Sequence, residues 1–242
     1  DEEGIVLNER PCDYYYVTPG HQVPTGVTMS SARRRQLLEH AARHDAVIIE
    51  DDYDSESNFT LNPLPALKAS DRSGRVVYVS SLSKALSPGL RLGFMVADPD
   101  LIDEARALRR LVYRHPPTNI QYQMAHFLAQ GHYETHLRRY HYDSAQRWER
   151  LHAALQRYLP SCRALAGSEH ANAFWLQTPA QINTQQLTWR AAHAGVLIEP
   201  GARHFLNAAP PDNYFRMGFH AINPDAIAQG VEVLRGQLEQ MG

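Results

Sequence analysis

The sequence predicts an α/β fold in which a mainly parallel sheet is followed by a smaller α+β domain. Short apolar runs alternate with helical patterns in the first half of the chain, and after Pro160 the pattern changes to shorter strands. A hydrophobic content of 43% with 21% charged residues is typical of a globular protein that buries a core. We place the large domain at residues 1–132 and the small C-terminal domain at residues 133–242.

Short apolar runs mark the strands of the first half. Tyr14–Thr18 is an aromatic and β-branched run that stops at a Pro-Gly pair, which is typical of a buried strand followed by a turn. Similar runs predict strands at Ala46–Ile49, Val76–Val79 and Leu92–Val96. Because helical patterns separate the strands, we expect mainly parallel pairing with right-handed crossovers.

Capping residues locate the helices. Ser30 or Ser31 can cap a helix that runs to Arg43, and an Asp-Pro pair starts another at Asp98. Later helices are expected at Asn119–Gln130, Tyr133–Tyr158, Gln185–Ala194 and Asp225–Gln240, and later strands at Ala173–Gln177, Val196–Glu199 and Tyr214–Phe219. This mixture predicts the smaller α+β domain.

Composition narrows the classes of function. A net charge of −2 and a pI near 6.7 argue against nucleic-acid binding by this segment. Cys12 and Cys162 predict free thiols in a reducing compartment, with a disulfide as the minority alternative, and the histidines form no metal motif. No apolar run approaches the ~20 residues of a membrane span, and no signal peptide is present, so we expect a cytoplasmic protein.

Polar residues directly follow two of the predicted strands. In open α/β sheets, ligands bind beyond the carboxyl ends of the strands, so these positions predict a site. They are Asp51, Asp52 and Tyr53 after the second strand, Ser81, Ser83 and Lys84 after the third, and Arg91 beyond a Pro-Gly turn. Two strand ends therefore present a carboxylate, a phenol, hydroxyls, an amine and a guanidinium to one crevice.

This set of groups suits pyridoxal phosphate. A lysine amine forms a Schiff base with the cofactor aldehyde. A carboxylate beside the pyridine nitrogen keeps that nitrogen protonated, so that the ring acts as an electron sink. A phenol can bond the ring's phenolic oxygen, while hydroxyls and an arginine hold the phosphate.

Two groups of motifs connect the chain to known proteins. The run Ser81–Lys84, followed by Pro-Gly-Leu-Arg-Leu-Gly, resembles the lysine motif of fold-type I aminotransferases. Thr18–Gly26 and Glu50–Glu56 more specifically resemble the MocR-type regulators, which fuse a GntR-type winged helix to an aminotransferase-like domain. The resemblance runs over nearly the whole chain and is strongest over Asp1–Phe94.

The resemblance implies a role for each matching residue. The cofactor-binding residues that it implies are Lys84, Asp51, Tyr53, Ser81, Ser83 and Arg91. Lys84 would form the Schiff base, Asp51 would pair with the pyridine nitrogen and Tyr53 would contact the phenolic oxygen. The other three would hold the phosphate. Arg216 resembles the arginine that binds the carboxylate of a substrate or effector.

The chain departs from the aminotransferase pattern in two respects. Where aminotransferases have an asparagine before the Pro-Thr-Gly turn, this chain has Val23, so His21 or Gln22 would bond the phenolic oxygen instead. MocR-type sequences commonly carry such a His-Gln pair. The resemblance also places the glycine-rich phosphate loop, the aromatic residue stacked on the ring and the winged helix upstream of Asp1. We therefore expect a partial large domain, in which pyridoxal phosphate binding is weak or absent.

Each assignment has a plainer alternative. Asp51 could cap a helix, Tyr53 could pack in the core, and the serines could be turn hydroxyls. The arginines could be partners in structural ion pairs, and His21 could make only a local hydrogen bond. Asp52 and Asp54 are expected to be structural or solvent-facing.

Two classes of function stay open. The first is a domain of a MocR-type regulator that senses an amino-acid-like effector through pyridoxal phosphate on Lys84. Such a domain would form a homodimer with His115–Asn119 lent to the partner's site, and it would reach DNA only through a winged helix that is absent from this chain. The second is an aminotransferase that uses Lys84 as a general base. The His-Gln pair favours the regulator over the enzyme, and a cofactor-free dimerisation scaffold is the third alternative.

Overall fold

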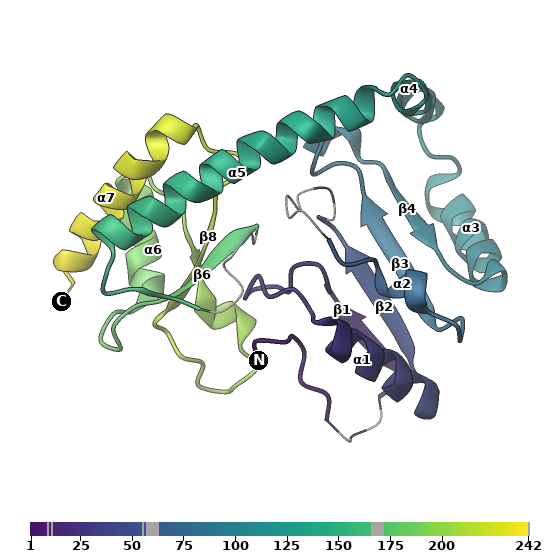
Figure 1. The fold of residues 1–242 in the computed structure, drawn as a ribbon, viewed down its shortest axis with the longest axis horizontal. Coiled ribbons are helices and arrows are strands. Elements are labelled where there is room, and N and C mark those ends of the chain that lie inside the picture. The colour runs from purple at the N-terminus through teal and green to yellow at the C-terminus, as the bar shows by residue number, and fades with distance from the viewer. Residues whose placement is uncertain (9, 11, 55, 57–62, 166–171, 242) are drawn as a thin grey trace. The chain divides into compact units, whose positions relative to one another are not determined.

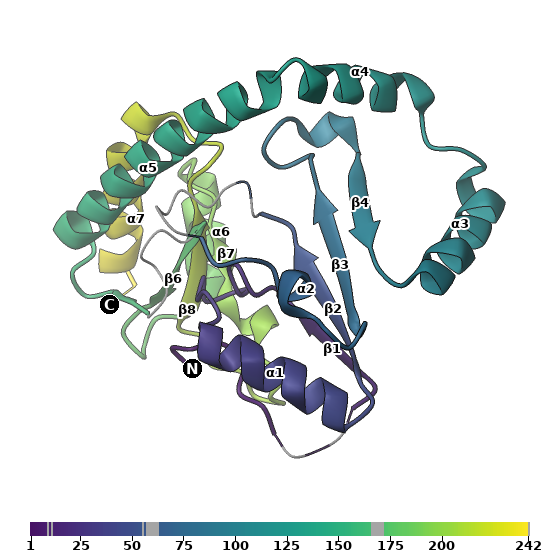
Figure 2. The same cartoon turned by 45° about the vertical axis from the view of Figure 1, so that its right-hand side comes forward.

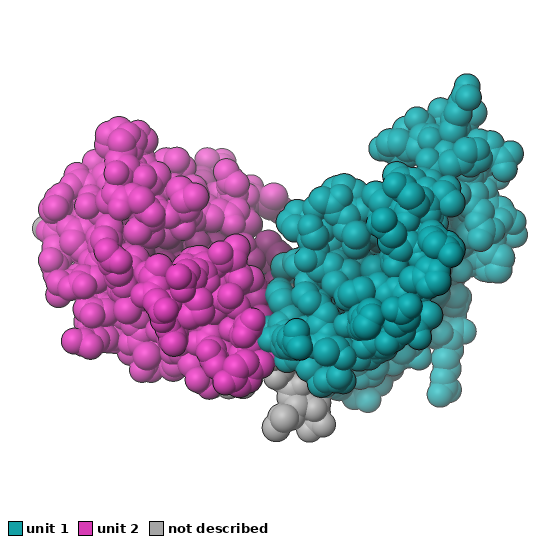
Figure 3. Space-filling view, turned by 90° about the horizontal axis from the view of Figure 1, so that it is seen from above, with its two compact units in different colours: residues 1, 3–22, 28–141 teal, residues 2, 23–27, 142–242 magenta. Residues whose placement is uncertain are grey.

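The computed structural model comprises two compact units. It describes residues 1–8, 10, 12–54, 56, 63–165 and 172–241. Unit 1 contains residues 1, 3–22 and 28–141, and unit 2 contains residues 2, 23–27 and 142–242; Figure 3 colours them separately. Each unit has a sheet of its own.

Unit 1 is built on a four-stranded sheet with the order β1-β2-β3-β4 (Figure 1). The strands are β1 (Tyr14–Val17), β2 (Val47–Asp52), β3 (Val76–Ser81) and β4 (Gly93–Val96). The first three pair in parallel, whereas β4 runs antiparallel to β3. The predicted α/β fold with a mainly parallel sheet is therefore confirmed.

Two helices cover one face of this sheet (Figure 2). Helix α1 (Ser31–Arg43) follows its N-cap Ser30, whose side chain accepts a hydrogen bond from the Arg33 backbone at 3.1 Å. Helix α2 (Leu67–Ser70) is a single turn. The shared core contains Val17, Met29, Leu37, Ala41, Ala46, Ile48, Leu67 and Val76. Burial of these apolar side chains fixes which face of the sheet is turned away from solvent.

Three further helices follow β4 along the chain. They are α3 (Pro99–Tyr113), α4 (Thr118–Ala129) and α5 (His132–Tyr158). Asp98 caps α3 as predicted, because its side chain accepts a hydrogen bond from the Asp100 backbone at 3.0 Å. Helix α5 is continuous, and the two compact units divide within it, after His141.

Unit 2 has a four-stranded sheet with the order β5-β6-β8-β7 and antiparallel pairing throughout. Its strands are β5 (Arg163–Ala164), β6 (Ala173–Gln177), β7 (Glu199–Pro200) and β8 (Tyr214–Gly218). Besides the part of α5 from Tyr142 onward, its helices are α6 (Thr184–His193), α7 (Ile227–Glu239) and the single turns η3 (Gly201–His204) and η4 (Pro224–Ala226). Phe174, Leu187, Phe215 and Leu234 are fully buried at 0% exposure and form its centre.

The structure differs from the sequence-based prediction at several elements. The strand predicted at Val196–Glu199 is wrong, because the structure forms only the two-residue β7 there. The predicted strand at Ala46–Ile49 is too short, since β2 continues to Asp52. Helix α2 was missed because it directly follows Pro63 and Pro65, which are typical of a loop.

Among the residues that the structure describes, no helix combines the length and the apolar character that a membrane crossing requires.

Candidate functional site

The carboxyl ends of β2 and β3 form the candidate site in unit 1. Their parallel register pairs Asp51 with Val79. Because successive side chains of a strand point to opposite faces, Asp51 and Ser81 share one face of the sheet. Asp52 pairs with Ser80 on the other face, which α1 and α2 cover. The structure thus brings one predicted carboxylate and one predicted hydroxyl to the same edge and face.

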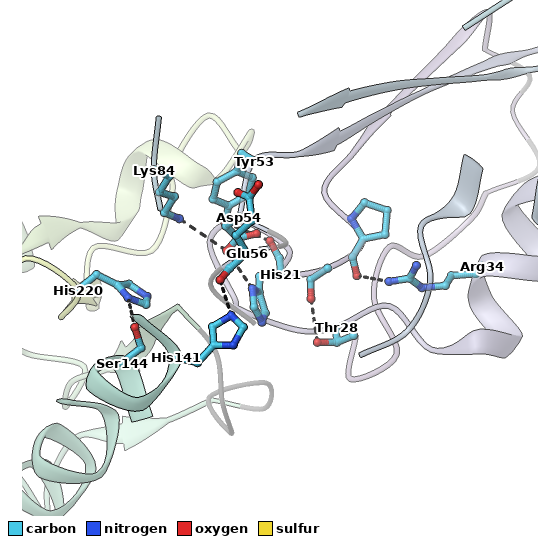
Figure 4. A network of polar contacts seen from close by, with 12 residues as sticks. His21, Thr28, Arg34, Tyr53, Asp54, Glu56, Lys84, His141, Ser144 and His220 are labelled. Atoms are coloured by element: carbon cyan, nitrogen blue, oxygen red, sulfur yellow. Dashed lines mark hydrogen bonds and ion pairs between the residues drawn. The ribbon is translucent and has the colours of Figure 1, made fainter. Parts of the chain in front are cut away.

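Lys84 lies after β3, and its side chain points toward the segment that follows β2 (Figure 4). Its Nζ lies 4.3 Å from the centroid of the Tyr53 ring and 3.6 Å from Oδ2 of Asp54. The Lys84 side chain is one-third exposed, at 33%, whereas that of Asp54 is 2% exposed. The structure therefore brings Lys84 and Tyr53 together as two predicted members of the site, and it adds Asp54.

Asp51 has a phenol partner on the neighbouring strand. The Tyr16 hydroxyl donates to Oδ2 of Asp51, a contact between β1 and β2. This hydrogen bond is the largest contribution that raises the pKa of Tyr16 to about 12, and burial adds to it. Asp52 receives a separate hydrogen bond from the Tyr78 hydroxyl at 2.7 Å. The two adjacent carboxylates are thus oriented by different tyrosines on opposite faces.

His21 and Gln22 come from the loop after β1. His21 is buried, and its Nδ1 lies 2.9 Å from Oδ2 of Asp54. The Tyr53 hydroxyl donates to the His21 carbonyl oxygen at 3.3 Å. Gln22 is half-buried and packs against Gly4, whose φ of +114° only glycine adopts readily. The loop that was predicted to supply a partner for the cofactor is therefore joined to Tyr53 and Asp54.

The residues predicted to hold phosphate follow β3. The hydroxyl of Ser81 accepts a hydrogen bond from the Ser83 backbone at 3.2 Å, and Ser83 is buried. Arg91 is exposed and ends the short helix η2 (Pro88–Leu90) with a left-handed backbone, at a φ of 47°.

Arg216 lies in unit 2, on β8. Its guanidinium lies 3.4 Å from a carboxylate oxygen of Glu199 on the paired strand β7. The Arg216 side chain is 22% exposed, so this ion pair leaves the side chain partly accessible to solvent. Arg216 thus makes an ion pair, as expected if its role is structural rather than the binding of an effector carboxylate.

A buried carboxylate anchors the strand that carries Asp51. Glu50 is 1% exposed and accepts hydrogen bonds from the backbones of Leu67 and Lys68 at 2.7 and 2.9 Å. Burial raises the pKa of Glu50, and the two backbone hydrogen bonds lower it in part. The Arg34 guanidinium donates to the Pro65 carbonyl oxygen just before α2 at 2.6 Å, and to the Pro19 carbonyl oxygen at 2.9 Å. These contacts fix the strand end and the start of α2 to one another.

The first turns of α5 hold both loops of the site. His136 Nε2 lies 2.7 Å from the carbonyl oxygen of Ala85, which directly follows Lys84. His141 Nε2 lies 2.7 Å from the carbonyl oxygen of Glu56, as Figure 4 shows, and the Tyr133 hydroxyl donates to the Glu56 carboxylate. The segment after β2 and the segment after β3 are therefore attached to one helix.

The groups gathered here fit pyridoxal phosphate by their chemistry. An amine that can bond an aldehyde carbon lies beside a phenol, and a carboxylate and a hydroxyl share one sheet face at adjacent strand ends. An exposed arginine, Arg91, and a buried serine, Ser83, follow on the same connection.

A comparison with protein families identifies the family to which the chain belongs. The profile of class I and II aminotransferases matches residues 17–234. The chain belongs to this family. Known structures agree with the assignment of a fold-type I aminotransferase domain. A multiple substrate aminotransferase from Thermococcus profundus has a TM-score of 0.87 at 28% identity, over 96% of this chain and 57% of that one.

Two further solved aminotransferases carry the cofactor or a derivative of it. Pyrococcus horikoshii kynurenine aminotransferase, solved with PMP, has a TM-score of 0.86 at 28% identity, over 94% of this chain and 56% of that one. The α-aminoadipate aminotransferase LysN from Thermus thermophilus, solved with N-(5'-phosphopyridoxyl)-L-leucine, has a TM-score of 0.86 at 26% identity, over 96% of this chain and 60% of that one. Both of these ligands are derivatives of pyridoxal phosphate, so the cofactor predicted from the sequence agrees with what these two related enzymes bind.

Among curated relatives, transcriptional regulators match the chain over most of its length. The HTH-type transcriptional regulator TauR of Rhodobacter capsulatus is 38% identical over 96% of this chain and 48% of the regulator. The probable rhizopine catabolism regulatory protein MocR of Rhizobium meliloti is 34% identical over 91% of this chain and 44% of that protein. The predicted resemblance to MocR-type regulators is therefore confirmed. The chain spans about half the length of these relatives.

Sequence reasoning missed the residues that orient the predicted ones. Tyr16 was predicted only as part of a buried strand, but the structure leaves it exposed on β1, where its hydroxyl donates to Asp51. Of the two alternatives expected for Asp54, structural or solvent-facing, the second is wrong: Asp54 is buried and contacts Lys84. The pairing of a histidine at 21 with an acid at 54 had no signal in the sequence, because the two lie on different loops.

Proposed function

We propose that this aminotransferase domain is the effector-sensing part of a MocR-type regulator that binds pyridoxal phosphate through Lys84. The observation that carries the proposal is the position of the Lys84 amine, over the Tyr53 ring at the strand ends that also present Asp51 and Ser81. The 38% identity to a regulator, higher than to any aminotransferase cited above, supports a regulatory protein. DNA would be bound by a separate domain of the longer protein.

The residues of the site take the following roles. Lys84 would provide the attachment to the cofactor, Asp51 would hold a proton at the pyridine nitrogen, and Tyr53 would donate to the phenolic oxygen, with His21 or Gln22 as its supplement. Ser81, Ser83 and Arg91 would hold the phosphate through hydroxyl and guanidinium donors. When bound, the cofactor supplies an electron sink for an attached amine.

The effector class follows from the charged groups. An attached effector needs an amine for the cofactor, and Arg216 would bind its carboxylate in exchange for part of the Glu199 ion pair. We therefore propose an amino-acid-like effector. A homodimer with His115–Asn119 near the partner's site, a cytoplasmic location and the division into domains at residues 1–132 and 133–242 belong to the same proposal.

The test uses the scarcity of lysine in this chain. Lys68 and Lys84 are its two lysines, so borohydride reduction in the presence of pyridoxal phosphate followed by peptide mass analysis separates them. We expect the cofactor mass on the Lys84 peptide and its loss in Lys84→Ala. Lys68→Arg is the control, because the Lys68 amine is held by the Val76 carbonyl oxygen at 2.7 Å, away from the site. Equal labelling of Lys68 and Lys84 would contradict the proposal.

An aminotransferase is the second candidate, because the solved structures with TM-scores of 0.86 and 0.87 are enzymes. Lys84 would then also move a proton as a general base. Repeated conversion of a 2-oxo acid with an amino donor, lost in Lys84→Ala, would favour the enzyme over the sensor. Labelling of Lys84 without such turnover favours the sensor, and absence of labelling favours a scaffold without cofactor.

A further inference from the structure

We propose that Asp54, oriented by His21, is the positioning residue that receives the Lys84 ammonium whenever an effector amine displaces Lys84 from the cofactor. This inference rests on the proposed function. It assigns a role to a carboxylate that is neither the predicted partner of the pyridine nitrogen nor a predicted phosphate ligand.

The contacts around Asp54 form a binding position for a cation. Its Oδ2 lies 3.6 Å from the Lys84 Nζ and 2.9 Å from the His21 Nδ1. Both Asp54 and His21 are buried, at 2% and 3% exposure. Below the amine lies the Tyr53 ring, whose face also attracts a cation. The Lys84 side chain itself is partly exposed, so it can leave this position without breaking the core.

Displacement of Lys84 creates the charge that Asp54 would receive. As the bond from the effector nitrogen to the cofactor carbon forms, the bond from that carbon to Lys84 Nζ breaks. The effector ammonium loses two protons and the Lys84 nitrogen gains two protons, so Lys84 leaves as an ammonium. No oxidant or reductant is involved. A buried carboxylate at the end of the Lys84 side chain therefore favours the displaced state over the attached one.

The size of the effect follows from the distance. At 3.6 Å in a water-like medium, which the exposed third of Lys84 makes appropriate, one carboxylate changes the protonation equilibrium of an amine about fivefold to tenfold. His21 contributes by holding the carboxylate oxygen toward the amine rather than by contacting Lys84.

The first experiment measures Lys84 without any cofactor. Trace acetylation with acetic anhydride at fixed neutral pH reacts only with the uncharged amine, and peptide mass analysis gives the Lys84 and Lys68 rates in the same sample. We expect Asp54→Asn to raise the Lys84 rate about fivefold and to leave Lys68 unchanged. Asp52→Asn is the matched control, because it removes a carboxylate on the opposite face that is bonded to Tyr78. An unchanged Lys84 rate in Asp54→Asn overturns the inference.

Two further measurements keep the outcome decisive. Asp54→Glu retains the charge, so its Lys84 rate should stay within about twofold of the wild type even if Asp54→Asn folds poorly; a rise as large as in Asp54→Asn contradicts the proposal. In the protein loaded with pyridoxal phosphate, methylamine should displace Lys84, as measured by loss of borohydride labelling. We expect Asp54→Asn to need about fivefold more methylamine. If the wild type takes no label, the proposed function fails, while the acetylation result still judges Asp54.

Discussion

Replacement of Glu50 by alanine should destabilise unit 1 by removing the acceptor for two backbone N–H groups. The Leu67 N–H is buried, and the Lys68 N–H is partly so. A buried donor left without an acceptor costs about 1–3 kcal/mol, so the two together give about 2–4 kcal/mol in the free energy of unfolding. Relief of the buried charge offsets part of this, and we expect a net loss of about 2–3 kcal/mol.

Glu50→Gln separates the two contributions. The glutamine oxygen can accept one N–H, while its amide nitrogen faces the other, so the expected loss is about half that of Glu50→Ala. Urea unfolding followed by far-ultraviolet circular dichroism measures both variants against the wild type. A loss below about 1 kcal/mol in Glu50→Ala would refute the reasoning, because it would mean that water or a neighbouring group replaces the carboxylate.

The pH dependence of the free energy of unfolding gives a second, independent test of the role of Glu50. Burial raises the pKa of folded Glu50 above its ordinary value of 4.5, so between these two values the folded protein binds more protons than the unfolded chain. The contribution of Glu50 to stability is therefore largest below pH 4.5 and is lost as the pH rises through the folded pKa. The difference between wild type and Glu50→Ala should widen on acidification from neutral pH. A difference that narrows contradicts this sign.

Two predictions concern unit 2, which contains all three tryptophans of the chain and is therefore followed by their fluorescence. Gly201→Ala should destabilise it by about 1–3 kcal/mol, because the added carbon would lie 2.6 Å from the Trp175 ring and from Tyr214. Gly236→Ala should stabilise it by about 0.5–1 kcal/mol, because the added carbon would meet open space on α7. Equal effects of the two substitutions would contradict the packing argument. Burial lowers the pKa of His204, so the folded state binds fewer protons and loses stability as the pH falls below the ordinary value of 6.5. The stability advantage of wild type over His204→Gln should therefore shrink on acidification to about pH 5, and a growing advantage would contradict it.

The strands of the first half could be predicted because burial on one face leaves a record in the sequence. Val17, Ile48 and Val76 meet α1 in the core, and each lies in an apolar run that the sequence displays. The end of β2 could not be predicted in the same way. Its last residues are acidic, and they stay in the strand because the backbone ladder with β3 continues to Ser80. A ladder between strands far apart in sequence has no local signature. For the same reason the isolated strand at 196–199 was overpredicted, since β7 pairs with β8 at two residues only.

The residues of the candidate site also fall into a predictable and an unpredictable group, for the same physical reason. The position of Lys84, Tyr53 and Asp51 near adjacent strand ends could be predicted, because parallel strands deliver the residues after them to one edge whatever the remaining contacts are. Which carboxylate of the acidic run turns inward depends on where the strand stops. Alternation assigns Asp51 and Asp52 to opposite faces, but β2 ends at Asp52, and beyond that point the two-residue period no longer decides the direction of Asp54. Its direction is set instead by His21, on a loop after another strand. The positions of the groups proposed to bind the cofactor thus follow from local pattern and topology, whereas the groups that contact Lys84 depend on two loops that meet only after the sheet has formed.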